Sequence, residues 1–229
     1  MRNESGELSE AEVALQVRSV AFRLLGSLLL DPRSIGWDAI RAPELTDAFV
    51  HVLGEPFAAL WCLMQSTEAG ETDAVIEEHD RLFRVPMPGW VSPYASVYAK
   101  TRANKKSRGL GFLMGEPAQA AAEWIRNLGM EIDRRAARGA LPDHIGILFA
   151  LHAEALMATS TSLEGDRVGY AEIGPKIMEW SRPVAENLEK TAKHPFWRAC
   201  AGCCRKLIDA EVSRINGKGS QPNTDAAAS

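Results

Sequence analysis

Apolar residues recur along most of the chain with the three- and four-residue spacing that is typical of amphipathic helices. The first such segment begins at Ser9, which has the spacing of a capping box with Glu12 and is followed by apolar residues at helical spacing. We expect this helix to end at Asp31, because the residue before a proline is disfavoured in the α region. The same spacing predicts further helices over residues 45–53, 56–68, 72–83, 117–129, 143–161, 173–190 and 195–215, one of which Pro183 is expected to kink or split.

Turn-forming residues separate most of these segments, for example Gly54 with Pro56 and Gly115 with Pro117. No run of alternating apolar and polar residues is bounded by hairpin turns, and no fixed-period repeat is present. The sequence therefore predicts an all-α fold, a single-domain globular helical bundle of about 8–11 helices. We expect this bundle to span residues 9–216, with a flexible N-terminus over residues 1–8 and a disordered tail over residues 217–229.

The amino-acid composition excludes several classes of protein. Of 229 residues, 46% are hydrophobic and 24% are charged, which is typical of a globular protein with a sizeable core. The net charge of −4 argues against a general nucleic-acid-binding protein. We find no stretch of about 20 apolar residues and no apolar signal-peptide core at the N-terminus, so we expect a cytoplasmic protein without membrane insertion. Four cysteines do not make a disulfide framework in a chain of this length.

Sequence motifs of common enzymes are absent. The chain has no Walker motif, no nucleophile elbow and no HExxH pair, and the glycines at positions 109, 111 and 115 follow no predicted strand. A helical enzyme built around Asp143 and His144 would lack a nucleophile or cofactor loop beside that pair. We therefore expect a protein that is not an enzyme.

Cys200, Cys203 and Cys204 lie on one face of a predicted helix, with His194 nearby. Three thiols at this spacing suggest a metal-binding or redox helical protein as the alternative function. No second pair of ligands completes a site, and cysteine often packs as a small hydrophobic residue. We favour core packing and predict no metal.

Asp143 and His144 follow Pro142 at the start of a predicted apolar helix. Aspartate at this position is typical of an N-cap, and we favour that interpretation. The other interpretation is that a carboxylate and an imidazole at a helix N-terminus form a polar contact for a ligand.

The segment from Arg84 to Tyr98 is rich in prolines and aromatic residues and cannot form a regular helix. Together with Phe83, its rings Trp90, Tyr94 and Tyr98 could line a groove for an apolar peptide or could fill the core. The residues alone leave both interpretations open.

Two charged segments stand out. Residues 68–80 carry six acidic side chains without a lysine or arginine among them, which is typical of a solvated helix face or of a partner for a basic peptide. Residues 100–108 form a basic loop, Lys100–Arg108, to which we assign no role.

The motif Glu78-His79-x-x-Leu82-Phe83-x-x-Pro86, followed by Pro93-Tyr94-x-Ser96-x-Tyr98 and later by Pro142-Asp143-His144-Ile145, resembles the TorD/DmsD/NarJ family. The resemblance covers roughly residues 10–212 and is strongest to the DmsD-like members. It implies an all-helical chaperone that acts in molybdoenzyme maturation in the cytoplasm and has no catalytic activity. Such a chaperone binds the twin-arginine signal peptide of a molybdopterin-dependent oxidoreductase, and holds that enzyme back from export until its cofactor is inserted.

The resemblance also implies where the partner binds. Carried over to the matching positions, it assigns signal-peptide binding to Leu82, Phe83, Pro86, Trp90, Pro93, Tyr94, Ser96, Tyr98, Pro142, Asp143 and His144. It implies no cofactor, although some members bind a guanine nucleotide or the body of the client enzyme. We expect a monomer or a domain-swapped dimer. From sign complementarity we add the hypothesis that Glu77, Glu78 and Asp80 contact the twin arginines.

Overall fold

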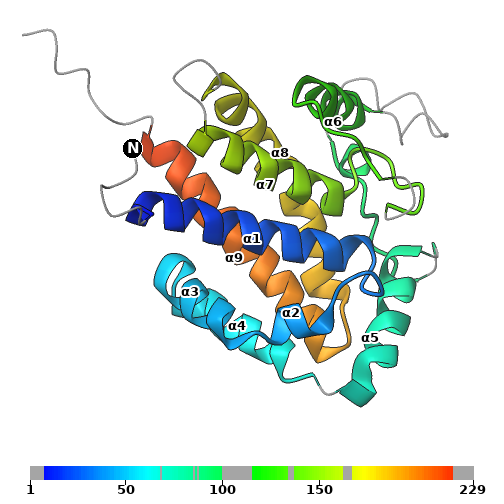
Figure 1. Cartoon of the computed structure of the whole chain (residues 1–229). Coiled ribbons are helices and arrows are strands. Elements are labelled where there is room, and N and C mark those ends of the chain that lie inside the picture. Colours follow the sequence, from blue (N-terminus) through cyan, green and yellow to red (C-terminus); the bar gives the residue numbers. More distant parts are fainter. Residues whose placement is uncertain are drawn as a thin grey trace, which may run out of the picture.

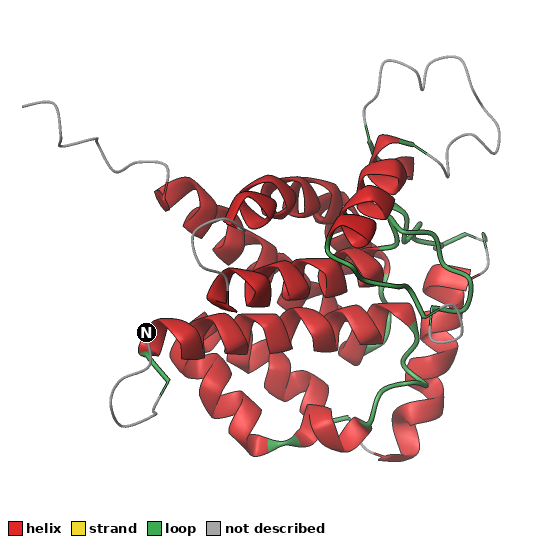
Figure 2. Cartoon of the chain, turned by 45° about the horizontal axis from the view of Figure 1, so that its top comes forward, coloured by secondary structure: helices red, strands yellow, loops and turns green. Residues whose placement is uncertain are grey.

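The computed structural model describes residues 8–67, 69–84, 86, 88–99, 115–133, 137–161 and 167–218. Within these residues the regular structure is helical, and the predicted all-α class is confirmed (Figures 1 and 2). The α-helices are α1 (Glu10–Leu30), α2 (Trp37–Arg41), α3 (Pro43–Leu53), α4 (Glu55–Gln65), α5 (Thr72–His79), α6 (Glu116–Asn127), α7 (Ile145–Thr161), α8 (Arg167–Thr191) and α9 (Pro195–Lys218).

Most predicted helices lie where their apolar spacing placed them, and the capping box of Ser9 and Glu12 opens α1 as expected. Three details differ. Helix α2 was not predicted, because five residues are too few to show a helical period. Helix α8 runs through Pro183 without being split. The predicted helix 72–83 changes at His79 into a π-helical turn, Asp80–Arg84.

Helices α1, α7 and α9 form the centre of the bundle. Helix α1 lies along α7, and α9 crosses behind α1 to pack against α4 and α8 (Figure 1). The largest fully buried side chains are aromatic, including Trp61, Trp197, Phe22 and Phe149. The core is therefore shared by helices from both ends of the sequence.

Helix α1 corrects one expectation. Although we found no segment able to span a membrane, α1 is long and apolar enough to do so by length and composition, with a mean hydropathy of 1.5. The core helix of a globular bundle meets the same test, and α1 contributes fully buried Phe22, Leu25, Leu28 and Leu29 to the core.

The close approach of α1 and α7 depends on two glycines. A Cβ atom added at Gly26 would lie 2.7 Å from the carbonyl oxygen of Gly146, and one added at Gly146 would lie 2.6 Å from the carbonyl oxygen of Gly26. Backbone atoms cannot move aside as a flexible side chain can. The glycine pair therefore sets the distance between the end of α1 and the start of α7.

We expect Gly26→Ala to lower the free energy of unfolding by about 1–3 kcal/mol, because the added methyl group forces the two helices apart. This net loss would appear despite the higher helix propensity of alanine. Gly70→Ala is the matched control, because a Cβ atom there meets nothing within 4 Å. Denaturant unfolding of both variants tests the prediction, and equal stability of the two would contradict it.

Candidate functional site

The two motifs that the sequence singled out are joined by their backbones. Tyr94 and His144 form an isolated antiparallel bridge. The amide of Ile145 donates to the carbonyl of Pro93 at 2.8 Å, and the amide of Ala95 donates to the carbonyl of Asp143 at 3.0 Å. The proline-rich segment therefore lies directly against the N-terminus of α7.

Asp143 strengthens this junction and does not cap α7. Its side chain is fully buried, and Oδ2 accepts a hydrogen bond from the backbone amide of Ser96 at 2.8 Å. Burial raises the pKa of the Asp143 carboxyl, while hydrogen bonds from Ser96 act in the opposite direction. The interpretation of Asp143 as the helix cap is wrong, because its carboxylate is used by the neighbouring segment.

His144 caps α7 instead. Its Nδ1 accepts from the amide of Gly146 at 3.1 Å, and its carbonyl accepts from Ile147 and Leu148. Burial lowers the pKa of His144 to about 3, and the nearby His79 adds to this effect. The imidazole is therefore neutral, with Nδ1 as a hydrogen-bond acceptor, and its ring lies edge-on to Tyr94 at 5.5 Å between centroids.

The π-helical turn Asp80–Arg84 places two side chains of the motif in the core. Leu82 is fully buried, and Phe83 is 7% exposed and packs against His79 and Trp197. The indole of Trp90 donates to the carbonyl of Phe83 at 3.2 Å, which holds the proline-rich segment against the end of this turn. Such π turns are frequent at functional sites.

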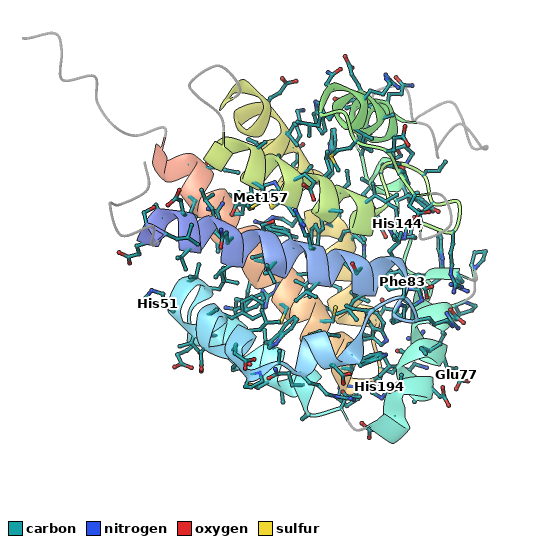
Figure 3. The ribbon with its side chains drawn as sticks, in the orientation of Figure 1. His51, Glu77, Phe83, His144, Met157 and His194 are labelled. Carbon is teal, nitrogen blue, oxygen red and sulfur yellow. The ribbon has the colours of Figure 1, made fainter. Side chains whose placement is uncertain are left out.

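Between these elements lies a groove of about 480 Å³. Figure 3 shows Phe83 and His144 close to the end of α1 on one side of the molecule. We call this the aromatic groove, and it is lined by Leu30, His79, Phe83, Arg84, Trp90, Pro93, Tyr94, Ala137, Arg138, Ala140 and His144.

The site residues from the sequence divide into three groups. Five of them line the aromatic groove: Phe83, Trp90, Pro93, Tyr94 and His144. Three are buried and do not line it: Leu82, Ser96 and Asp143. The remaining three lie elsewhere: Pro86 is exposed, Pro142 is half-buried, and Tyr98 donates its hydroxyl to the carbonyl of Ser92 and lines a separate pocket. Of the four rings, Phe83, Trp90 and Tyr94 therefore line the groove, whereas Tyr98 packs against the core.

The carboxylates expected to face the twin arginines are already engaged, with one exception. Glu78 forms a bidentate pair with Arg81 and accepts from the amide of Lys193. Asp80 pairs with Arg33 and Arg84. Burial acts to raise the pKa of the Asp80 carboxyl, but Arg33 and Arg84 together lower it below its ordinary value. Glu77 is exposed and points away from the helical body (Figure 3).

Sequence reasoning missed part of the groove. Leu30, Ala137, Arg138 and Ala140 come from the end of α1 and from the loop before α7. No local pattern in the sequence places either segment beside the aromatic motif. The only relevant signal is that this loop leads into Pro142 and the Asp143–His144 pair.

One further pocket adjoins the groove, and another lies apart from it. An apolar pocket of about 170 Å³ shares Leu30 and Ala137 with the aromatic groove and continues over Ile125, Met130 and Ile147. A pocket of about 290 Å³ lies beside Tyr98 and Trp180. The basic loop Lys100–Arg108 lies outside the described residues.

The three cysteines of α9 are core residues. Cys200, Cys203 and Cys204 are fully buried, and burial raises the pKa of Cys203. A hydrogen bond with Cys200 and burial raise the pKa of Cys204. Protonated, buried thiols are poor nucleophiles and poor metal ligands. Among the described residues, no group of three or more histidine, cysteine or acidic side chains is arranged to hold a metal ion.

Comparison with known proteins gives one match. A family model described as "Nitrate reductase delta subunit" matches residues 43–179, a range that contains the aromatic motif and the Asp143–His144 pair. No curated protein and no solved structure matches the chain.

Proposed function

Because the chain belongs to the nitrate reductase delta subunit family, the NarJ/TorD/DmsD chaperones of molybdoenzyme maturation, we propose that its aromatic groove binds the twin-arginine signal peptide of a client oxidoreductase. The family is non-catalytic, acts in the cytoplasm and binds nitrate reductase-type molybdoenzyme subunits. On this proposal, the chaperone holds its client back from export until molybdopterin is inserted. The client itself would be the catalytic subunit of a molybdopterin oxidoreductase of the DMSO reductase family.

The observation that carries the proposal is the composition of the groove. Five of the residues that the family resemblance links to peptide binding converge on one surface, although they come from two segments about 50 residues apart in the sequence. The bridge between Tyr94 and His144 fixes these segments to each other. A site with this much tertiary support is preorganised, which lowers the entropic cost of binding.

The groove suits the apolar part of a signal peptide. Such a segment forms a helix readily, and helix-in-groove recognition needs rigid apolar surface with few polar groups. Trp90 and Tyr94 provide large rings, and the Trp90 indole N–H is already satisfied within the chain. His144, whose pKa is lowered to about 3, is neutral, and the two arginines of the lining, Arg84 and Arg138, are paired with Asp80 and Asp31. The adjoining apolar pocket would accept further residues of the same segment.

We expect Trp90→Ala to weaken binding of a twin-arginine signal peptide by more than about tenfold, because buried tryptophans at the centre of an interface often contribute 2 kcal/mol or more. Isothermal titration with a synthetic signal peptide would measure the dissociation constant. The loss should occur without a change in the helical circular dichroism signal.

Leu63→Ala is a suitable control, because Leu63 is 57% exposed on α4, outside the residues that line the groove. It removes apolar surface without touching the groove and should leave the affinity unchanged. Unaltered affinity in both variants would show that the peptide binds elsewhere.

A further inference from the structure

Asp31 is an unusual carboxylate beside the aromatic groove. It ends α1, its side chain is only 3% exposed, and it faces three arginines. The Nε atom of Arg138 forms an ion pair with Oδ2 at 2.7 Å, whereas Arg33 and Arg84 approach Oδ1 at 3.5 and 3.7 Å. The strongest contact of this buried carboxylate is therefore with an arginine that lines the groove.

Arg138 differs from the other two arginines. Its backbone has φ of 47°, the only positive φ of a residue other than glycine among the described residues. Its side chain is 45% exposed, and Asp31 is its one ion-pair partner within the described part of the chain. Arg33 and Arg84 each pair with both Asp31 and Asp80, so Arg138, which pairs with Asp31, is the easiest of the three arginines to displace.

We propose that Asp31 recognises an arginine of the twin-arginine motif, and that Arg138 occupies this position in the free chaperone until the peptide displaces it. The proposal rests on the proposed function of the groove. Upon binding, the guanidinium of the peptide would take the place of the Arg138 guanidinium on Oδ2, so that one ion pair replaces another. The second arginine of the motif would then lie towards Asp80, which shares Arg33 and Arg84 with Asp31.

Asp80 is a poorer first contact than Asp31. Arg33 donates to both oxygens of Asp80, at 3.1 and 2.6 Å, and Arg84 adds a further ion pair at 3.0 Å. An incoming arginine would have to displace the bidentate Arg33 from both oxygens of Asp80, whereas at Oδ2 of Asp31 it would displace Arg138 and leave the Oδ1 contacts with Arg33 and Arg84 in place. Exchange is therefore easier at Asp31.

The position of Asp31 also fits the order of residues in a signal peptide, in which an apolar segment follows the arginines. Leu30, the neighbour of Asp31, lines both the aromatic groove and the apolar pocket, and so does Ala137, the neighbour of Arg138. An arginine held at Asp31 would deliver the residues that follow it directly to apolar surface. In the site, apolar surface therefore adjoins the charged residue Asp31, just as the apolar segment of the signal peptide follows its arginines.

The test compares two peptides on three proteins. The peptides are a twin-arginine signal peptide and the same peptide with both arginines replaced by glutamine. The proteins are the wild type, Arg138→Gln and Arg23→Gln; the last removes the same charge from an exposed pair with Glu154 on another part of the surface. Titration at low and at high salt gives the dissociation constants.

We expect Arg138→Gln to bind the twin-arginine peptide about fivefold more tightly than the wild type, because a competitor for the site has been removed. The glutamine peptide should bind Arg138→Gln and the wild type with equal affinity. Arg23→Gln should bind each peptide as the wild type does. Asp31→Asn, checked for its melting temperature, should abolish the preference for arginine over glutamine.

The exchange at Asp31 would be overturned if Arg138→Gln and Arg23→Gln gained affinity equally. It would also be overturned if Arg138→Gln gained affinity equally for both peptides. In that case the aromatic groove would still bind the peptide, and the proposed function would stand. If the wild type bound neither peptide, both the proposed function and the inference would fail.

Discussion

Glu211→Ala is expected to lower the free energy of unfolding by about 3–5 kcal/mol, the usual cost of leaving one charge of a buried ion pair without its partner. Glu211 lies on α9 with a fully buried side chain, and Arg18 of α1 donates to it from Nε at 3.0 Å and from Nη2. His152 of α7 places Nε2 3.4 Å from the same carboxylate. One carboxylate therefore connects the three central helices.

Urea unfolding measures this effect, and the exposed pair of Arg182 and Asp209 provides the control. These two side chains are 39% and 45% exposed and 2.7 Å apart, so Asp209→Ala should cost less than about 1 kcal/mol. Replacing both members of the buried pair, as Arg18→Met with Glu211→Leu, should recover much of the lost stability. Similar costs for Glu211→Ala and Asp209→Ala would mean that burial adds nothing to this pair.

The second large effect is a loss of stability in mild acid. The pKa of His144 is about 3 in the folded protein and 6.5 when unperturbed, so below pH 6.5 the unfolded chain takes up a proton that the folded chain does not. Stability therefore falls as the pH drops from 6.5 towards 3. For His144 alone, we expect the free energy of unfolding to fall by about 2 kcal/mol between pH 7.5 and pH 5. Burial also lowers the pKa values of His79 and His152, which act in the same direction.

His144→Asn isolates this contribution. Asparagine is a good N-cap, so it keeps an acceptor for the amide of Gly146 but does not titrate. The difference in unfolding free energy between pH 7.5 and pH 5 should be about 2 kcal/mol smaller in the variant. Asp143, whose raised pKa acts in the opposite direction, is present in both proteins and largely cancels. If His144→Asn kept the full pH dependence of the unfolding free energy, the assignment of this effect to His144 would be wrong.

Local patterns predicted the helices well, because each central helix carries its own apolar spacing and often its own cap. The capping box of Ser9 and Glu12 is one example. Features that depend on residues distant in the sequence could not be predicted from local patterns. Asp143 has the sequence context of a cap, yet Ser96 recruits its carboxylate and His144 takes over the capping role.

The ion-pair partners of the charged residues could not be predicted for the same reason. The acidic run of residues 68–80 contains no arginine, but Arg33 reaches Asp80 from another part of the chain and Arg81 follows directly after it to pair with Glu78. Asp31 and Arg138 are 107 positions apart in the sequence, and no local spacing could have paired them. The aromatic motif identified one wall of the groove, while the other wall is set by tertiary structure.

The bridge between Tyr94 and His144 has a consequence for the order in which the protein is made. During synthesis, the end of α1 and the aromatic segment emerge well before the loop and the helix start that complete the groove. A nascent chain that ends before Ala137 has the rings but neither the loop that lines the groove with them nor the amide of Ile145 that holds Pro93. The protein therefore becomes able to bind a peptide late in its synthesis, once segments that are distant in the sequence are in contact. A peptide-binding assay on this chaperone is thus also an assay of its completed fold.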